Sequence, residues 1–167
     1  CMRLRWVRSD KSLYSRLGWG VGISAMTVRA FIGGAGCGKT HQLMQSLINH
    51  LETEPLKDGQ KVLALTFMHG SRRRLEERLA QLNIVNKRTE CTTIDSFAWR
   101  LVRRWLSLAT RLGFTNIESD QYERVCDAAG ALLQIKEVCG WVAATFPILL
   151  VDEAQDLTAN RLQIVTG

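Results

Sequence analysis

The sequence predicts an α/β fold built on a parallel sheet with helices on both faces. Three observations predict it. Apolar segments typical of buried strands alternate with segments of helical periodicity, a glycine-rich turn follows the first strand, and a strand near residue 150 ends in carboxylates. A chain of 167 residues with 46% hydrophobic residues is also large and apolar enough to bury one core.

The first half of the pattern contains two strand–helix units. Residues 28–33 (VRAFIG) predict a buried strand, and residues 39–52 predict the helix that follows it. Residues 61–67 (KVLALTF) predict a second buried strand, and residues 71–82 a second helix. Apolar side chains repeat on one face of each helix: Leu43, Leu47, Ile48 and Leu51 in the first, and Leu75, Leu79 and Leu82 in the second.

The second half begins with a short strand near residues 90–93. A long amphipathic helix is expected after it, because apolar residues recur there at helical spacing. These residues are Ile94, Phe97, Ala98, Leu101, Val102, Trp105 and Leu106. A further helical stretch is expected at about 120–144, and the apolar run FPILLVD at 146–152 predicts the last strand.

Residues 1–25 show no clear periodicity, and we interpret them as a leader outside the fold, with disorder as one interpretation. They carry five basic residues and one acidic residue, so most of the net charge of +6 lies there. The rest of the chain is close to neutral. Its total charge therefore gives little support for nucleic-acid binding, and such a function must depend on local clusters.

The cysteines and the hydropathy pattern exclude several classes of protein. The five cysteines form an odd set without a C-x-x-C pair, which argues against a disulfide framework and against a zinc site. No run reaches the roughly 18 apolar residues of a membrane span, and the charged start lacks the apolar block of a signal peptide. We therefore expect no membrane partner and a cytoplasmic location.

The segment GGAGCGKT, residues 33–40, matches the phosphate-binding pattern G-x-x-x-x-G-K-[ST] between a predicted strand and a predicted helix. Its glycines let successive backbone N–H groups point at phosphate oxygens, and the helix adds the positive end of its dipole. We expect Lys39 to reach the β and γ phosphates and Thr40 to hold Mg²⁺. A glycine turn that binds nothing would need neither side chain. The rest of the predicted cradle is Gly33, Gly34, Ala35, Gly36, Cys37 and Gly38.

The segment ILLVDEAQD, residues 148–156, places Asp152 at the carboxyl end of a strand, where open parallel sheets bind ligands. We expect Asp152 to coordinate Mg²⁺, mostly through water. Glu153 is the candidate general base that orients and deprotonates the water attacking the γ-phosphate. A solvated acidic turn is the alternative. A small-molecule kinase would use the same two motifs, so they leave the type of reaction open.

Four segments in this order, GGAGCGKT, VLALTF, TTIDSF and LLVDEAQD, resemble the amino-terminal ATPase core of the UvrD/Rep-like family of superfamily 1 DNA helicases. The resemblance implies a RecA-like P-loop NTPase fold, with residues 26–167 as an incomplete first motor domain and a short helical insert at about 98–145. It also implies ATP and Mg²⁺ as cofactors and single-stranded DNA as a partner. In the family's D-E-x-Q-D motif the glutamine contacts the γ-phosphate and couples hydrolysis to the DNA site, which implies this role for Gln155.

The resemblance also implies contacts with single-stranded DNA at five residues: Thr66, Phe67, Arg78, Ser96 and Phe97. Phe97 fits the apolar stripe of its helix as well. We interpret it first as a core residue and second as a base-stacking residue, an interaction of about 1–3 kcal/mol. Two positions depart from the family, because Gly70 stands at the usual lysine position and Asp95 replaces the histidine of T-x-H-S-F. A capping role at the start of the helix is expected for Asp95.

Further departures concern the segments around these motifs. Residues 1–32 contain no glutamine that would read adenine, so adenine selectivity is an assumption. The interval from Phe97 to Asp152 leaves room for two or three helices only, so any duplex-contacting insert is reduced or missing. The second motor domain of the same chain, with its arginines, is expected to be missing. Because an arginine finger contributes about 10³ to 10⁵ in rate, we expect this fragment to bind ATP–Mg²⁺ with little turnover.

An ATP-dependent DNA helicase or translocase, with a nuclease as one downstream possibility, is the leading hypothesis for the complete protein. An RNA-directed superfamily 1 helicase stays open, because TTIDSF and Asp156 favour DNA by resemblance only. A P-loop kinase of a small molecule would have no reason to carry Gln155 and Asp156. A non-catalytic ATP-binding switch or a degenerate prophage remnant is the last alternative, and the intact residues of both phosphate motifs argue against it.

Overall fold

The computed structural model describes residues 2–9, 26–33, 38–67, 69–82, 88–152 and 158–166, and gives the backbone alone for residues 2–9, 26–33, 39, 69 and 166. The strands are β1 (Met2–Ser9), β2 (Met26–Gly33), β3 (Val62–Thr66), β4 (Thr89–Thr93) and β5 (Ile148–Val151). The helices are α1 (Lys39–Thr53), α2 (His69–Ala80), α3 (Ile94–Arg104), α4 (Leu106–Arg111), α5 (Tyr122–Leu133), α6 (Lys136–Thr145) and α7 (Ala159–Thr166).

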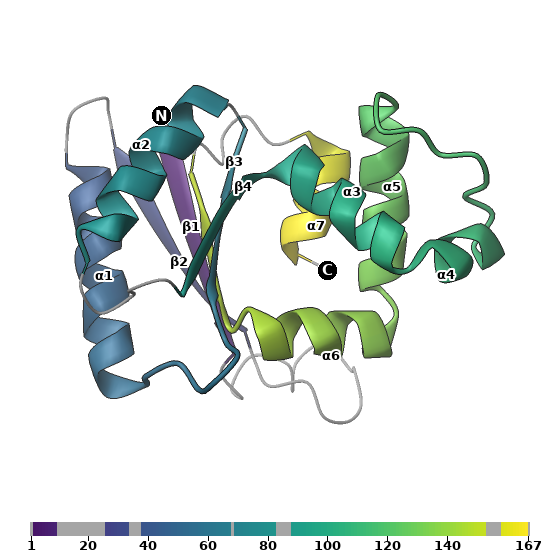
Figure 1. Ribbon diagram of the computed structural model, residues 1–167. Helices are drawn as coiled ribbons and strands as arrows, with labels where there is room; N and C mark the ends of the chain where they lie inside the picture. Colours follow the sequence, from purple (N-terminus) through teal and green to yellow (C-terminus); the bar gives the residue numbers. More distant parts are fainter. Residues whose placement is uncertain are drawn as a thin grey trace.

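The described strands form one sheet in the order β2-β1-β5-β3-β4. Helices α1 and α2 lie on one side of it, and α3, α5, α6 and α7 lie on the other (Figure 1). Strand β3 runs parallel to both β4 and β5. The predicted α/β class, with parallel strands and helices on both faces, is therefore confirmed.

Strand β1 is the exception to the parallel pairing, because it pairs antiparallel with β2 and with β5. This strand belongs to the leader at residues 1–25, of which residues 10–25 lie outside the described part. Its sequence shows no long periodicity, but Arg3 and Arg5 alternate with Leu4 and Trp6, a short run that agrees with a strand. The division of the chain at residue 25 stays a prediction.

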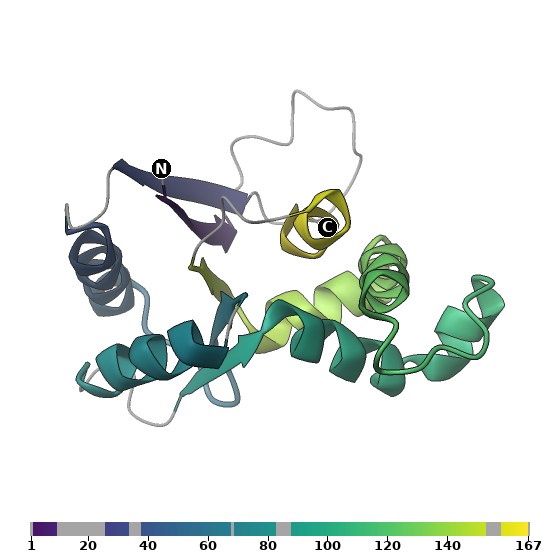
Figure 2. The ribbon, with the colours of Figure 1, turned by 90° about the horizontal axis from the view of Figure 1, so that it is seen from above.

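The core consists of two apolar layers, one on each face of the sheet. Strand β3 is buried along its whole length, and its alternating side chains enter both layers. Val62 and Ala64 pack with α1 and α2, whereas Leu63 and Leu65 pack with the helices of the other face. The view from above separates these two groups of helices (Figure 2). None of the described helices combines the length and the apolar character that crossing a membrane requires.

The predicted stripe of the long helix is confirmed from Ile94 to Val102, whose members are buried. The prediction that the same helix continues through Trp105 and Leu106 is wrong. Helix α3 ends at Arg104, and Trp105 leaves the helical region with φ −113° and ψ 34°. The chain turns there, and Leu106 at the start of α4 is 53% exposed. The helical stretch expected at about 120–144 likewise consists of two helices, α5 and α6.

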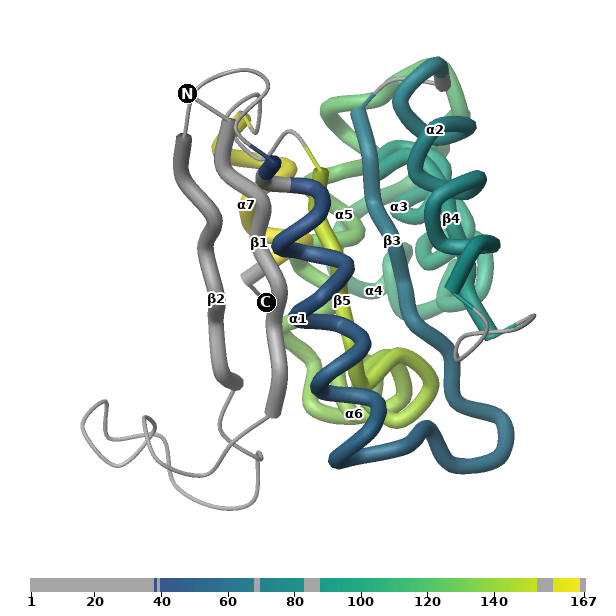
Figure 3. The backbone as a smooth tube through the Cα atoms, turned by 90° about the vertical axis from the view of Figure 1, so that its left-hand side faces the viewer, coloured from purple at the N-terminus to yellow at the C-terminus, as the bar shows by residue number. Residues whose placement is uncertain are grey.

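Replacing Leu47 by alanine tests the packing of α1 on the sheet. Leu47 is fully buried, and α1 runs along the sheet in front of β5 (Figure 3). We expect Leu47→Ala to lower the free energy of unfolding by about 2–5 kcal/mol, because it removes apolar contacts and leaves a cavity. Leu106→Ala is the matched control, and its expected effect on an exposed side chain is within about 0.5 kcal/mol. Equal effects in urea denaturation would contradict this packing.

Candidate functional site

The ends of the strands gather at one edge of the sheet. On β1, Met2 lies opposite Gly33 of β2, and Arg5 lies opposite Val151 of β5. Because both neighbours are antiparallel to β1, β2 and β5 run in the same direction. Strands β3 and β4 are parallel to β5, so they end at this edge too. The phosphate-binding segment, Asp152, Thr66, Phe67, Ser96 and Phe97 therefore lie at or just after strand ends on the same side, where parallel sheets bind ligands. Arg78 lies away from the strand ends, in the last turn of α2.

The described part of the phosphate-binding segment suits an anion. Gly38 precedes α1 in the left-handed conformation, with φ 76° and ψ 14°. The first turn of α1 contains no acidic residue, and among the described residues no side-chain cap satisfies its first backbone N–H groups. These groups and the positive end of the helix dipole favour phosphate.

Thr40 is half-buried in the first turn of α1, and Lys39 is the first residue of that helix. Gly33 ends β2. The other predicted members of the cradle lie outside the described residues: Gly34, Ala35, Gly36 and Cys37. The backbone thus places the first and last residues of the phosphate-binding pattern, Gly33 and Thr40, beside the edge of the sheet.

Asp152 follows β5 directly. Its backbone N–H donates to the carbonyl oxygen of Leu65 at 3.0 Å, which ties the start of the acidic segment to the end of β3. Burial raises the pKa of the Cys91 thiol to about 11, and the negative charges of Glu76 and Asp152 add to this increase. Cys91 therefore stays neutral near Asp152. Glu153 and Gln155 lie outside the described residues.

The donors in the described part fit a magnesium ion shared with phosphate. No group of three or more His, Cys, Asp or Glu side chains that could hold a metal occurs among the described residues. Thr40 offers a hydroxyl oxygen and Asp152 a carboxylate, which are the hard oxygen ligands that Mg²⁺ accepts. Mg²⁺ commonly binds one or two protein groups together with substrate phosphates and water. The two roles stay predictions.

The two predicted DNA-contact segments, which contain Thr66 and Ser96, lie side by side, because Thr66 of β3 is opposite Thr93 of β4. Thr66 is buried, and the half-buried Phe67 packs against the core on the side of α3. The Thr93 hydroxyl donates to the Ser96 hydroxyl at 2.7 Å and accepts from the Ser96 backbone N–H at 3.2 Å. Thr93 is thus the N-cap of α3, and the capping role expected for Asp95 is wrong.

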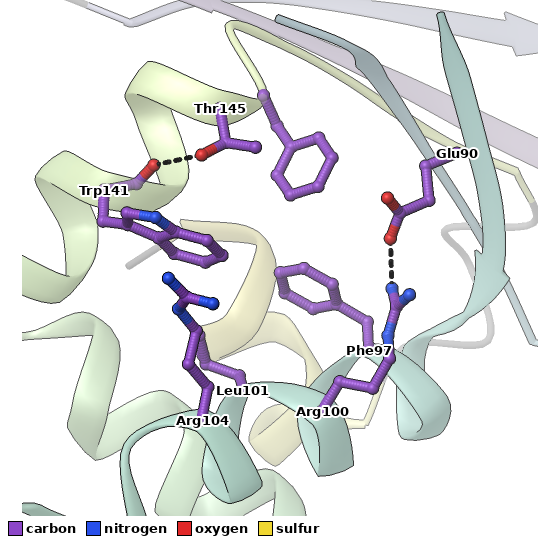
Figure 4. A pocket seen from close by; sticks show the side chains of 8 residues that line it. Glu90, Phe97, Arg100, Leu101, Arg104, Trp141 and Thr145 are labelled. Carbon is purple, nitrogen blue, oxygen red and sulfur yellow. Dashed lines mark hydrogen bonds and ion pairs between the residues drawn. The ribbon is translucent and has the colours of Figure 1, made fainter. Parts of the chain in front are cut away.

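Phe97 and Arg78 lie in different surroundings. Phe97 is 4% exposed, which agrees with the prediction that it is a core residue. Its ring packs edge to face against Phe146 at a centroid distance of 6.3 Å. Its ring lines a hollow of about 300 Å³ between α3 and α6, where Arg104 stacks on Trp141 (Figure 4). Arg78 is exposed in the last turn of α2. Their DNA roles stay predictions.

Arg161 is a residue at this edge that the motifs do not indicate. It lies in α7, and its Nε and Nη2 atoms donate to the two carboxylate oxygens of Asp95 at 2.9 and 3.1 Å. The guanidinium also lies 6.0 Å from the centre of the Phe67 ring. Asp95 and Arg161 are far apart in the sequence. The one sequence feature that pointed to a different contact at this position is Asp95 itself, which replaces the family's histidine.

Replacing Gly38 by alanine tests the left-handed turn before α1. A side chain at φ 76° is strained, so we expect Gly38→Ala to lower the free energy of unfolding by about 1–2 kcal/mol. Gly70→Ala in α2 is the matched control, where alanine meets nothing within 4 Å. It should raise stability by up to about 1 kcal/mol, because alanine favours helix. A stabilising effect at both positions in urea denaturation would rule out the left-handed turn.

The comparison with protein families agrees with this geometry. The family model of the UvrD/REP helicase N-terminal domain matches residues 24–128, more than half of the chain. The match contains the phosphate-binding segment and both predicted DNA-contact segments. No curated protein and no solved structure matches the chain. The chain therefore belongs to the family of UvrD/REP helicase N-terminal domains, which are helicase-type ATP-binding domains.

Proposed function

We propose that the chain is the ATP-binding part of an ATP-dependent DNA helicase or translocase that couples ATP hydrolysis to movement on single-stranded DNA. One observation carries this proposal: the ends of β2, β5, β3 and β4 lie at one edge of the sheet. The phosphate-binding segment, Asp152 and the predicted DNA-contact segments all start there. Nucleotide and DNA would therefore bind to neighbouring parts of the same edge, as coupling between them requires.

On the nucleotide side, residues 33–38 and the first turn of α1 would hold the triphosphate through backbone N–H groups. Lys39 would neutralise the β and γ phosphates. Thr40 and Asp152 would position Mg²⁺, which draws electron density from the γ-phosphate when bound. Glu153 would orient the attacking water and accept its proton. Gln155 would contact the γ-phosphate and so couple ATP hydrolysis to the DNA-contact segments.

On the DNA side, the backbone at Thr66 and Phe67 and the half-buried side chain of Phe67 would contact single-stranded DNA, whereas the buried Thr66 side chain would have to become exposed first. The exposed Ser96 would donate to a phosphate. Arg78 would add positive charge, and Phe97 would stack on a base only after its ring leaves the core. A second motor domain would supply the arginines that stabilise the transferring phosphoryl group. The proposed location is the cytoplasm.

Two substitutions separate nucleotide binding from hydrolysis in the complete protein. Lys39→Ala should abolish ATP binding measured by isothermal titration calorimetry, because it removes the cation facing the β and γ phosphates. Glu153→Gln should keep ATP binding and reduce turnover by at least about 100-fold, because the amide cannot accept the proton. Lys57→Ala is the matched control, since Lys57 is exposed in the loop after α1. It should change neither quantity.

Normal turnover by the Glu153→Gln protein would contradict the assignment of the general base. Unchanged ATP binding by Lys39→Ala would contradict the nucleotide site itself. The ATPase rate of the unmodified protein, measured once in the presence of single-stranded DNA and once in the presence of RNA, identifies the polynucleotide. Stronger stimulation by DNA is the expected result, and stimulation by RNA alone would favour an RNA-directed helicase.

A further inference from the structure

The ion pair between Asp95 and Arg161 joins two segments with different predicted partners. Asp95 lies in the first turn of α3, next to Ser96 in the segment TTIDSF. Arg161 lies in the first half of α7, the helix that follows the acidic segment at residues 152–156. We propose that this ion pair is a positioning link that makes the nucleotide segment and the DNA-contact segments move together. This inference rests on the proposed function.

The geometry of the pair favours a fixed orientation. Two parallel N–H···O contacts, at 2.9 and 3.1 Å, hold the guanidinium against both carboxylate oxygens. Such two-pronged pairs are directional and stronger than single contacts. The Arg161 side chain is 24% exposed and that of Asp95 is 28% exposed, so solvent screens the pair less than an ordinary surface ion pair.

Neighbouring groups hold the two side chains in this position. The Cys126 thiol of α5 donates to Asp95 Oδ1 at 3.5 Å. Burial, followed by the charge of Asp95, raises the pKa of this thiol to about 12, so it stays a donor. The hydrogen bonds to Asp95 raise the pKa of Arg161, which stays charged. The carboxylate thus accepts from two nitrogen donors and one sulfur donor, which come from two other helices.

Arg161 also reaches the other predicted DNA-contact segment. Its guanidinium lies 6.0 Å from the centre of the Phe67 ring, at the outer limit of a cation–π contact. One side chain therefore lies against both segments that resemble DNA-binding motifs. If a change at residues 152–156 displaced α7, Arg161 would move with the helix, and its contacts with Phe67 and with Asp95 at the start of α3 would change.

The packing of α7 gives Arg161 a distinct place in this helix. Ile164 and Val165 anchor the second half of α7 in the core. In the first half, which is nearer in sequence to residues 152–156, Arg161 supplies the ion pair to α3. A hollow of about 160 Å³, lined by Glu123, Cys126, Thr158, Asn160 and Arg161, lies beside it. The first half of α7 therefore borders a hollow, whereas its second half is held by core contacts.

The link is tested by the coupling between the two ligands in the complete protein. The dissociation constant of a fluorescein-labelled oligodeoxythymidine is measured with and without a saturating non-hydrolysable ATP analogue and Mg²⁺. The ratio of the two constants is the coupling, and allosteric couplings commonly amount to about 5- to 150-fold. For the unmodified protein we expect a ratio of about fivefold or more.

Asp95→Asn and Arg161→Gln should bring this ratio close to one, while each ligand alone keeps its affinity within about twofold. Restoration of the ratio by the reversed pair, Asp95→Arg with Arg161→Asp, would support the link. Arg73→Gln is the matched control, because it removes an exposed ion pair to Glu77 at 3.0 Å on α2 and should leave the ratio unchanged.

An unchanged ratio in both single variants overturns the link, and so does a ratio of one in the unmodified protein. If the single variants unfold, Arg161→Lys decides the question. Lysine keeps the charge without the two-pronged geometry, so an intermediate ratio supports the link and an unaltered ratio overturns it. Failure of the unmodified protein to bind both ligands would instead overturn the proposed function, so the two failures are distinguishable.

Discussion

The parallel pairing of β3 with β5 is the constraint on which the arrangement of the site depends. Leu65 lies opposite Val151, and the N–H of Asp152 continues the ladder to the Leu65 carbonyl oxygen. Because β3 is buried on both faces, a slip by one residue would exchange the side chains of the two apolar layers. The observed register of β3 with β5 and β4 therefore sets the position of Asp152 relative to Thr66 and the end of β4.

The two apolar layers position different parts of the edge. The layer of α1 and α2 holds the helix whose first turn faces the proposed phosphates. The layer of α3, α5 and α7 holds the start of α3 and the helix that follows the acidic segment. The sheet lies between these layers, whereas the Asp95–Arg161 pair connects two helices within one layer. We propose that the sheet holds the nucleotide and DNA-contact segments at one edge, and that the ion pair makes these segments move together.

Much of this arrangement can be predicted from local sequence patterns. Continuous apolar runs identify β3 and β5, and helical spacing identifies the buried face of α3. For α1 it identifies Leu43, Leu47 and Leu51, but Met44 is buried in place of the predicted Ile48. The break at Trp105 could not be predicted, because Leu106 continues the apolar spacing while the backbone leaves the helix. The ion pair of Asp95 with Arg161 could not be predicted either, because it depends on how α7 packs beside α3. The phosphate-binding pattern predicted the start of α1 because glycine at residue 38 permits a left-handed turn.

The central claim is that one triphosphate and its metal ion bind between the start of α1 and the end of β5. A crystal structure of the protein with Mg²⁺ and a non-hydrolysable ATP analogue tests it most directly. We expect phosphate oxygens against the backbone N–H groups of residues 33–40, with Asp152 reaching the metal ion directly or through water. Phosphates bound elsewhere, or Asp152 pointing away from the metal ion, would contradict it.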